Sequence, residues 1–183
     1  MKVMLTDVRI SFPQLFTAKA VNNQGDPRFS ACFMFDPKSE NAKQMATAIE
    51  AVANEKWGAK AKGILGELIA KDRVAYKAYE KKSESGDVYN GFAGTHHVNA
   101  SNKTRPLCLD KNKAPITAED GKLYGGCYVN ASIELWTQDN EFGKRINATL
   151  RGVQFVRDGE AFSGGAAASE DEFADLSTND LIG

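Results

Sequence analysis

The clearest pattern in the chain is an alternation of apolar and polar residues over positions 126–136 (GCYVNASIELW). Successive side chains of a β-strand point to opposite faces, so this alternation predicts a strand with one buried and one exposed face. The buried face would carry Cys127, Val129, Ala131, Ile133 and Leu135. The exposed face would carry Tyr128, Asn130, Ser132, Glu134 and Trp136.

A second alternating segment covers residues 144–157 and follows a stretch rich in turn formers, residues 138–143 (QDNEFG). It places Ile146, Ala148 and Leu150 inward and Arg145, Asn147, Thr149 and Arg151 outward. Two alternating strands joined by such a turn predict a β-hairpin.

The first third of the chain predicts two more strands and then a helix. Residues 2–10 and 28–35 have strand composition, and the residues between them, with Pro13 and a run of turn formers at 22–27, read as a loop. Asp36 followed by Pro37 predicts a helix start with Asp36 as the N-cap. Met45, Ile49 and Val52 follow at helical spacing, Gly58 marks the end, and residues 60–71 predict a weaker second helix.

Residues 73–113 are loop-like and basic, with short strands expected at 95–101 and 106–109. Five or more short strands with a helical insertion after the second strand predict a mainly β protein. The architecture that fits is a five-stranded antiparallel barrel of the OB-fold type, a fold that binds oligonucleotides across one sheet face.

The last residues of the chain, 163–183, differ in composition from the rest. A linker of small residues precedes five acids and no base, with apolar residues between the acids. We expect residues 1–162 to form the OB-fold domain that binds single-stranded DNA (ssDNA), and residues 163–183 to be a flexible, disordered acidic tail. The candidate partner-binding residues of the tail are Glu170, Asp171, Glu172, Phe173, Asp175, Leu176, Asp180, Leu181 and Ile182.

The tail changes the charge balance of the chain. The whole chain holds 23 bases and 24 acids; without the five tail acids, residues 1–162 hold 23 bases and 19 acids, a net charge of +4. A basic body with a tethered acidic segment predicts a surface for polyanions and an internal competitor for it. A tail that serves only solubility would have the same composition.

Cations interleaved with aromatic residues are the main candidate chemistry in the body. Cations bind phosphates and aromatic rings stack on unpaired bases, so the two together predict an ssDNA groove. A solvated helix face with tyrosines packed in the core would explain residues 71–82 equally well, and Trp136 would also suit a packed hairpin end. The candidate DNA-binding residues are Arg73, Tyr76, Lys77, Tyr79, Lys81, Lys82, Tyr89, Phe92, Lys103, Arg105, Lys111, Lys113, Trp136, Lys144, Arg145 and Arg151.

Signatures of an enzyme are weak. The two histidines, His96 and His97, are adjacent and would point to opposite faces of a strand, so we expect no shared metal. The three cysteines lack a CxxC spacing, which favours buried thiols over a disulfide framework or a zinc site. We therefore expect no catalytic residue, no metal and no cofactor. A metal-dependent nucleic-acid enzyme that uses His96, His97 or Cys108 remains an alternative. Without a signal-peptide core or a membrane-length apolar run, the expected location is the cytoplasm.

Several stretches resemble phage-encoded ssDNA-binding proteins with an OB fold and an acidic C-terminal tail. They are SFPQLF (11–16), GDPRFSACFMFDP (25–37), YNGFAGTHHVNASNKTRPLCLD (89–110), LYGGCYVNASIELW (123–136) and GKRINATLRGVQFVRDGEAF (143–162). The resemblance implies sequence-independent coating of unpaired DNA in phage replication, recombination or repair, with a polymerase, helicase or nuclease recruited through the tail.

The tail departs from some relatives, which end in an aromatic residue, because this chain ends in Leu181, Ile182 and Gly183. Self-association into a homodimer is left open. The alternative function is a protein-interaction module or DNA-mimic inhibitor whose body never contacts DNA.

Overall fold

The computed structural model describes residues 1–21, 24–162 and 173–177. Its strands are β1 (Lys2–Val21), β2 (Gln24–Phe35), β3 (Tyr76–Lys77), β4 (His96–Asn102), β5 (Leu107–Leu109), β6 (Tyr128–Asn140) and β7 (Gly143–Arg157). Two α-helices, α1 (Glu40–Trp57) and α2 (Ala61–Ala70), follow β2, joined by the short 3-10 helix η1 (Gly58–Lys60); a second 3-10 turn, η2 (Ala118–Asp120), precedes β6.

Five of these strands close into a barrel. The antiparallel neighbours run in the order β4, β2, β1, β6, β7, and a parallel pairing between Ser101 of β4 and Thr149 of β7 completes the ring. The short strands β3 and β5 add to β4 and β7 outside the ring. The predicted mainly β fold, an OB-type five-stranded barrel with a helical insertion, is confirmed, and its closure is parallel rather than antiparallel.

The alternation of β6 and β7 fills the barrel. Cys127, Val129, Ala131 and Ile133 are fully buried, and so is Leu150 of the neighbouring strand β7, which is paired with Ile133. The hairpin is longer than predicted, because the ladder continues to the pair of Asn140 and Gly143. Its turn therefore shrinks to two residues.

The expected loop after residue 10 is wrong, because β1 runs on as a single strand through Pro13 to its end at Val21. The pairing with β2 shifts register between Ser11 and Gln14, so the strand bulges where proline lacks a backbone N–H to donate. Phe12, inside that bulge, has a positive φ of 50°. The bulge therefore reconciles a turn-like sequence with a continuous strand.

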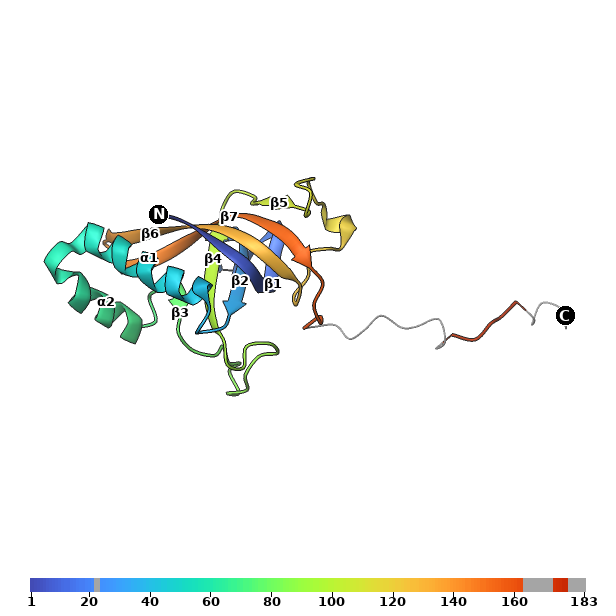
Figure 1. Ribbon diagram of the computed structural model, residues 1–183, viewed down its shortest axis with the longest axis horizontal. Helices are drawn as coiled ribbons and strands as arrows, with labels where there is room; N and C mark the ends of the chain where they lie inside the picture. Colours follow the sequence, from blue (N-terminus) through green and yellow to red (C-terminus); the bar gives the residue numbers. More distant parts are fainter. Residues whose placement is uncertain (22–23, 163–172, 178–183) are drawn as a thin grey trace.

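The helices lie together at one side of the barrel, with α1 against it, as Figure 1 shows. Met45, Ile49 and Val52 of α1 are buried, and Gly58 ends the helix, as predicted. The predicted N-cap is wrong: Ser39, not Asp36, accepts a hydrogen bond from the amide of Ala42. Asp36 instead accepts from the amide of Lys38 in the preceding turn. In the part of the chain that the structure describes, no helix is both long enough and apolar enough to cross a membrane.

Candidate nucleic-acid interface

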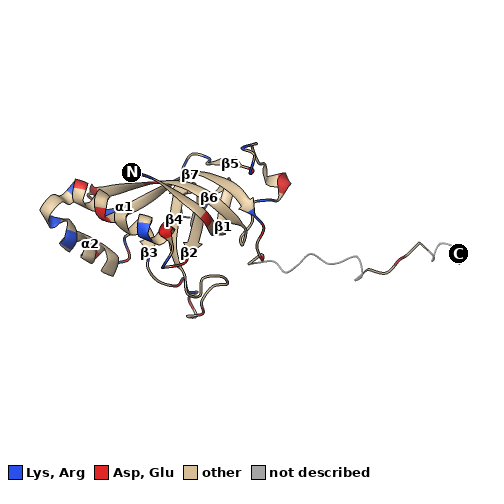
Figure 2. Ribbon diagram, viewed as in Figure 1, with Lys and Arg blue, Asp and Glu red and all other residues tan. Residues whose placement is uncertain are grey.

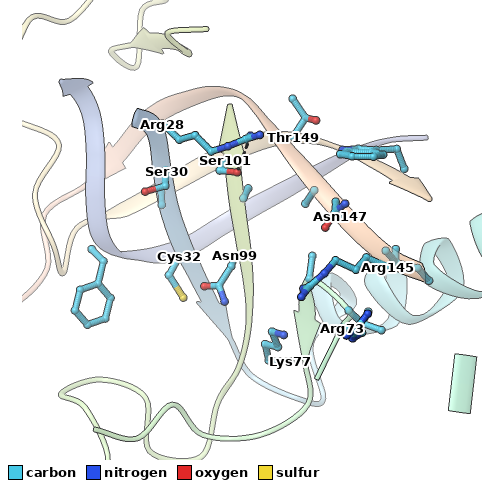
Figure 3. A pocket seen from close by; sticks show the side chains of 18 of the residues that line it. Arg28, Ser30, Cys32, Arg73, Lys77, Asn99, Ser101, Arg145, Asn147 and Thr149 are labelled. Carbon is cyan, nitrogen blue, oxygen red and sulfur yellow. Dashed lines mark hydrogen bonds between the residues drawn. The ribbon is translucent and has the colours of Figure 1, made fainter. Parts of the chain in front are cut away.

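A groove of about 930 Å³ runs over the outer face of β2, β4 and β7. Residues that alternate with the barrel core form its floor, so the pattern that fills the barrel also points polar side chains into the groove. Asn99 and Ser101 come from β4, and Asn147 and Thr149 from β7 (Figure 3). The floor is therefore polar but uncharged.

Cations surround this floor. Two come from the barrel strands β2 and β7, and three from the segment that follows α2. The backbone amide of Ile146 in β7 donates a hydrogen bond of 3.1 Å to the carbonyl of Arg73, which holds Arg73 beside β7. Figure 2 shows the distribution of charge over the ribbon, and Figure 3 shows Arg73, Lys77 and Arg145 near one another at one end of the groove. The groove cations are Arg28, Arg73, Lys77, Lys81 and Arg145.

Most of these cations are available to an anion. Among the described residues, Arg73, Lys81 and Arg145 take part in no ion pair, whereas Lys77 pairs with Asp72 at 2.8 Å. The Arg28 guanidinium lies 3.5 Å from the hydroxyl of Ser101 (Figure 3). Unpaired cations over a polar floor are suited to bind a phosphate backbone.

Three aromatic side chains that line the groove are exposed. Phe12 is 46 % exposed, Tyr89 37 % and Trp136 45 %. Phe12 and Tyr89 meet edge to face with centroids 5.2 Å apart, and the ammonium of Lys81 lies 5.6 Å from the Phe12 ring. Exposed rings beside cations provide faces on which unpaired bases stack.

The loop of residues 83–94, which carries Tyr89, is fastened to the body through Phe92. The Phe92 ring is fully buried with Cys32 and Met34, and Phe162 packs against this cluster. A side chain at Gly91 would collide with the Phe162 ring, and the Asn90 amide donates to the Phe162 carbonyl at 3.2 Å. Phe92 therefore anchors the loop, and a base cannot reach its ring, contrary to its predicted role.

His97 is buried beneath the same loop, edge to face with Phe92 and Tyr79. Burial first, and then the nearby charge of Lys81, lower the pKa of His97 to about 4. The imidazole is therefore neutral at physiological pH. Its Nδ1 atom has no hydrogen-bond partner among the described residues.

Tyr76 and Tyr79 do not line the groove, and their side chains contact other residues of the fold. Tyr76 stacks on Phe35 with centroids 6.0 Å apart, and its hydroxyl bonds His96 Nδ1 at 2.7 Å. Ala75 and Lys77 face the groove, so Tyr76, between them in an extended segment, faces away. The Tyr79 hydroxyl donates to Asp72 at 2.8 Å. Tyr79 and Lys82 line a separate hollow of about 480 Å³.

Six other predicted cations lie outside the groove, and five of them contact an acid or an aromatic ring. Lys103 pairs with Asp26 at 3.0 Å, and Arg151 pairs with Glu134 at 2.8 Å. Lys144 lies 3.6 Å from Asp139. Of the remaining three, Arg105 lies over Phe16, Lys111 lies over Phe155, and Lys113 occupies a turn with a φ of 68°.

The structure therefore brings six predicted residues into the groove: Arg73, Lys77, Lys81, Tyr89, Trp136 and Arg145. The site predicted from the sequence lacked several other residues that line the groove. Alternation along residues 28–35 and 95–101 could have indicated Arg28, Ser30, Asn99 and Ser101. Nothing in the sequence marked Phe12, which a bulge exposes. Apart from alanine, valine, isoleucine and cysteine side chains, the groove residues missing from the predicted site are Phe12, Arg28, Ser30, Asn99, Ser101, Gln138, Asn147 and Thr149.

Part of the predicted tail site can be placed. Phe173 is 72 % and Leu176 67 % exposed, and Asp175 accepts a hydrogen bond from the amide of Ser177 at 2.8 Å. The other predicted tail residues, Glu170, Asp171, Glu172, Asp180, Leu181 and Ile182, lie outside the described residues.

Metal chemistry finds no support in the described part of the chain, where no three His, Cys, Asp or Glu residues gather in a metal-binding arrangement. Cys32, Cys108 and Cys127 are buried free thiols, as predicted. Burial raises the pKa of Cys32 to about 12, so this thiol is protonated at neutral pH.

Comparisons with known proteins agree with the fold and with the resemblance seen in the sequence. The family model described as the ssDNA-binding protein of Enterobacter phage Enc34 matches residues 1–182. A protein of Acyrthosiphon pisum secondary endosymbiont phage 1, described as putative protein p50, is 43 % identical over 179 residues, which is 97 % of this chain and 95 % of that protein.

Solved structures show the same fold at lower identity. The ssDNA-binding protein from bacteriophage Enc34, in complex with ssDNA, matches with a TM-score of 0.73 and 24 % identity, over 88 % of this chain and 89 % of that one. The ssDNA-binding protein gp2.5 of bacteriophage T7 matches with a TM-score of 0.57 and 11 % identity, over 92 % of this chain and 98 % of that one.

Proposed function

This chain belongs to the Enc34 family of phage ssDNA-binding proteins, and on this premise we propose that it binds ssDNA in the groove over β2, β4 and β7. The observation that carries the proposal is the groove itself, in which unpaired cations, exposed aromatic rings and a polar floor occur together. Each class of side chain suits one part of a single strand: cations suit phosphates, rings suit bases, and the floor suits base and sugar edges.

Binding in this groove would tolerate most sequences. Phosphate contacts carry no sequence information, and every base has a π-face that can stack on Trp136, Tyr89 or Phe12. Stacking contributes about 1–3 kcal/mol per base. The proposed role is therefore the coating of unpaired DNA during phage replication, recombination or repair in the host cytoplasm.

We extend the proposal to the acidic segment of residues 163–183. Its root lies beside the groove, since Phe162 contacts the loop that carries Tyr89. About twenty coil residues have a root-mean-square reach of roughly 25 Å, which is enough to bring the acids to the groove cations. The segment would cover the groove when DNA is absent, and DNA would displace it.

Displacement would free apolar residues for a partner. Phe173 and Leu176 are exposed, so once DNA displaces the acids from the groove these side chains could anchor a replication protein. A polymerase, helicase or nuclease is the class of partner proposed, and a homodimer of this chain stays a prediction.

The test is a fluorescence-anisotropy titration of labelled oligo-dT and a matching duplex at two salt concentrations. Full-length protein is compared with a truncation that ends at residue 162. We expect tighter binding to the single strand than to the duplex, a strong salt dependence, and a gain in affinity on truncation. Unchanged affinity and salt dependence after truncation would refute the competitor role alone. Lack of binding by both forms would refute the DNA-binding function and favour the protein-interaction module.

A further inference from the structure

One end of the groove combines a stacking ring with an uncharged amide. Trp136 of β6 and Asn147 of β7 are directly paired across the ladder, and both line the groove. Side chains paired in this way have Cβ atoms about 4.5–5.5 Å apart. A base stacked on Trp136 would therefore bring its edge to the Asn147 carboxamide.

A chain of hydrogen bonds fixes which way this carboxamide points. The backbone N–H of Phe142 can only donate, and it donates to Asn140 Oδ1 at 2.9 Å. Gln138 Nε2 donates to the same oxygen at 3.3 Å, which leaves Gln138 Oε1 as an acceptor. Asn147 Nδ2 donates to that Oε1 at 3.1 Å.

Each hydrogen bond in this series fixes which end of the next amide donates and which end accepts. Since the turn N–H cannot reverse, flipping any one amide would set two donors or two acceptors against each other. Asn147 therefore keeps Nδ2 toward Gln138, and its Oδ1 is left as an acceptor. In the described structure no hydrogen bond uses this oxygen.

We propose that Asn147 is a specificity-determining residue that favours a base with an exocyclic amino group at the Trp136 position. Adenine, cytosine and guanine carry such a donor, and thymine does not. The only ring N–H of thymine lies between two carbonyl oxygens, so a hydrogen bond from it to Asn147 Oδ1 brings three acceptor oxygens close together and is weaker than one from an amino group. The inference rests on the proposed function, and it adds a base preference at one position of an otherwise tolerant groove.

The amide chain itself gives a second prediction. Gln138 is a positioning residue, because it orients Asn147 through the hydrogen bond to Nδ2. Gln138→Leu would let the Asn147 carboxamide rotate and present either its oxygen or its nitrogen. The preference would then fall although Trp136 and Asn147 are both still present.

The experiment compares oligo-dC with oligo-dT of one length, because the two pyrimidines have rings of similar size. Anisotropy titrations at one salt concentration and neutral pH use the full-length protein, Asn147→Leu and Gln138→Leu. We expect the wild type to bind oligo-dC about 2- to 10-fold more tightly than oligo-dT, as one net hydrogen bond would give. Both variants should bring this ratio close to one, and a cooperative thermal unfolding transition like that of the wild type would show that they fold.

Asn130→Leu is the matched control. Asn130 is also an asparagine on the β6–β7 sheet bonded to a glutamine, Gln154 at 3.2 Å, but it does not line the groove. Its dC-to-dT ratio should equal that of the wild type. A wild-type ratio of one, or a ratio unchanged in Asn147→Leu, would overturn the inference and leave DNA binding intact. Failure of the wild type to bind either oligonucleotide would overturn both the inference and the proposed function.

Discussion

Arg145 and Arg151 both point outward from β7, yet they lie in different surroundings. Arg145 lines the groove and takes part in no ion pair in the described structure, whereas Arg151 pairs with Glu134 at 2.8 Å outside it. The same division separates Lys81 from Lys103, which pairs with Asp26. A cation without a carboxylate partner can bind phosphate without first breaking an ion pair. Most cations of the groove are therefore available to phosphate, with Lys77, which pairs with Asp72, as the exception.

The largest effect should come from removing two available cations together. Arg73→Ala with Arg145→Ala should weaken ssDNA binding by about 10-fold per cation, since hydrogen bonds to charged groups contribute about 1.5–3 kcal/mol. Because each phosphate contact releases counterions, the slope of log affinity against log salt should fall by about 0.7 per cation. Anisotropy titrations over a salt series measure both quantities.

Arg151→Ala is the matched control for this prediction. The exposed ion pair that it removes contributes about 0–1 kcal/mol to stability, so the fold should persist. Affinity and salt slope should stay near those of the wild type. If Arg151→Ala weakened binding as much as Arg145→Ala, the distinction between paired and available cations would be wrong.

The next largest effect should come from Trp136, an exposed ring that lines the same groove as Arg145. Trp136→Leu should cost about 1–3 kcal/mol of binding free energy, and Trp136→Phe should restore most of it, because stacking needs only an aromatic face. The chain has one other tryptophan, Trp57, whose indole N–H donates to Asp139 at 2.9 Å. Quenching of tryptophan fluorescence by ssDNA should therefore survive in Trp57→Phe and disappear in Trp136→Leu. Quenching that persists without Trp136 would exclude it as a stacking site.

The barrel could be predicted from sequence because its signals are local. The alternation of residues 126–136 and 144–157 specifies which side chains fill the interior, and the structure buries Val129, Ile133 and Leu150 as that alternation requires. The same alternation names the outward residues of each strand. The alternation does not predict which strands lie side by side with their outward faces in one groove. The parallel pairing of Ser101 with Thr149 joins segments that are far apart in the sequence.

The candidate site was harder to predict because its residues resemble their structural counterparts. Phe92 and Tyr89 share one loop, but Phe92 is fully buried and Tyr89 is exposed. Lys103 and Lys81 are both lysines in basic stretches, and only the folded chain brings Asp26 to Lys103. Burial and long-range pairing decide these cases, and neither can be inferred from composition.

A smaller effect on binding should follow from loosening the wall of the groove. Phe162→Ala would remove the ring that packs on the Cys32, Met34 and Phe92 cluster. Loss of this packing should destabilise the fold by about 1–3 kcal/mol. Affinity should fall by only a few-fold, about the cost of reordering one or two side chains such as Tyr89 and Lys81 on binding.

Hydrogen exchange of residues 83–94 measures this loosening directly. Phe162→Leu, which keeps apolar volume under the loop, should protect these amides better than Phe162→Ala does. Equal protection in wild type and Phe162→Ala would show that Phe162 does not hold the loop.

His97 makes stability depend on pH in a defined window. Its pKa is about 4 in the folded chain against 6.5 for an ordinary histidine, so the unfolded chain binds the proton more readily between these values. The stability that neutral His97 provides is therefore complete above pH 6.5 and lost as the pH falls toward 4. At pH 5 the loss should be on the order of 2 kcal/mol, measurable by denaturant unfolding. His97→Phe should flatten this window, and His96→Gln should keep it.

The smallest effect is a change in the pKa of His97. This pKa reports the charge of Lys81 and should not respond to Lys103. The charge of Lys81 is one cause of the lowered pKa of His97, because no carboxylate partner neutralises that charge in the described structure. Lys81→Ala should therefore raise the pKa of His97, while burial keeps it below the ordinary value. Lys103→Ala, which removes a paired and distant cation, should leave it unchanged. Titration of the imidazole proton signals by NMR, with His96→Gln to assign them, separates the two variants. A pKa that does not move in Lys81→Ala would mean that the Lys81 charge is screened, and it would remove Lys81 from the available cations of the groove.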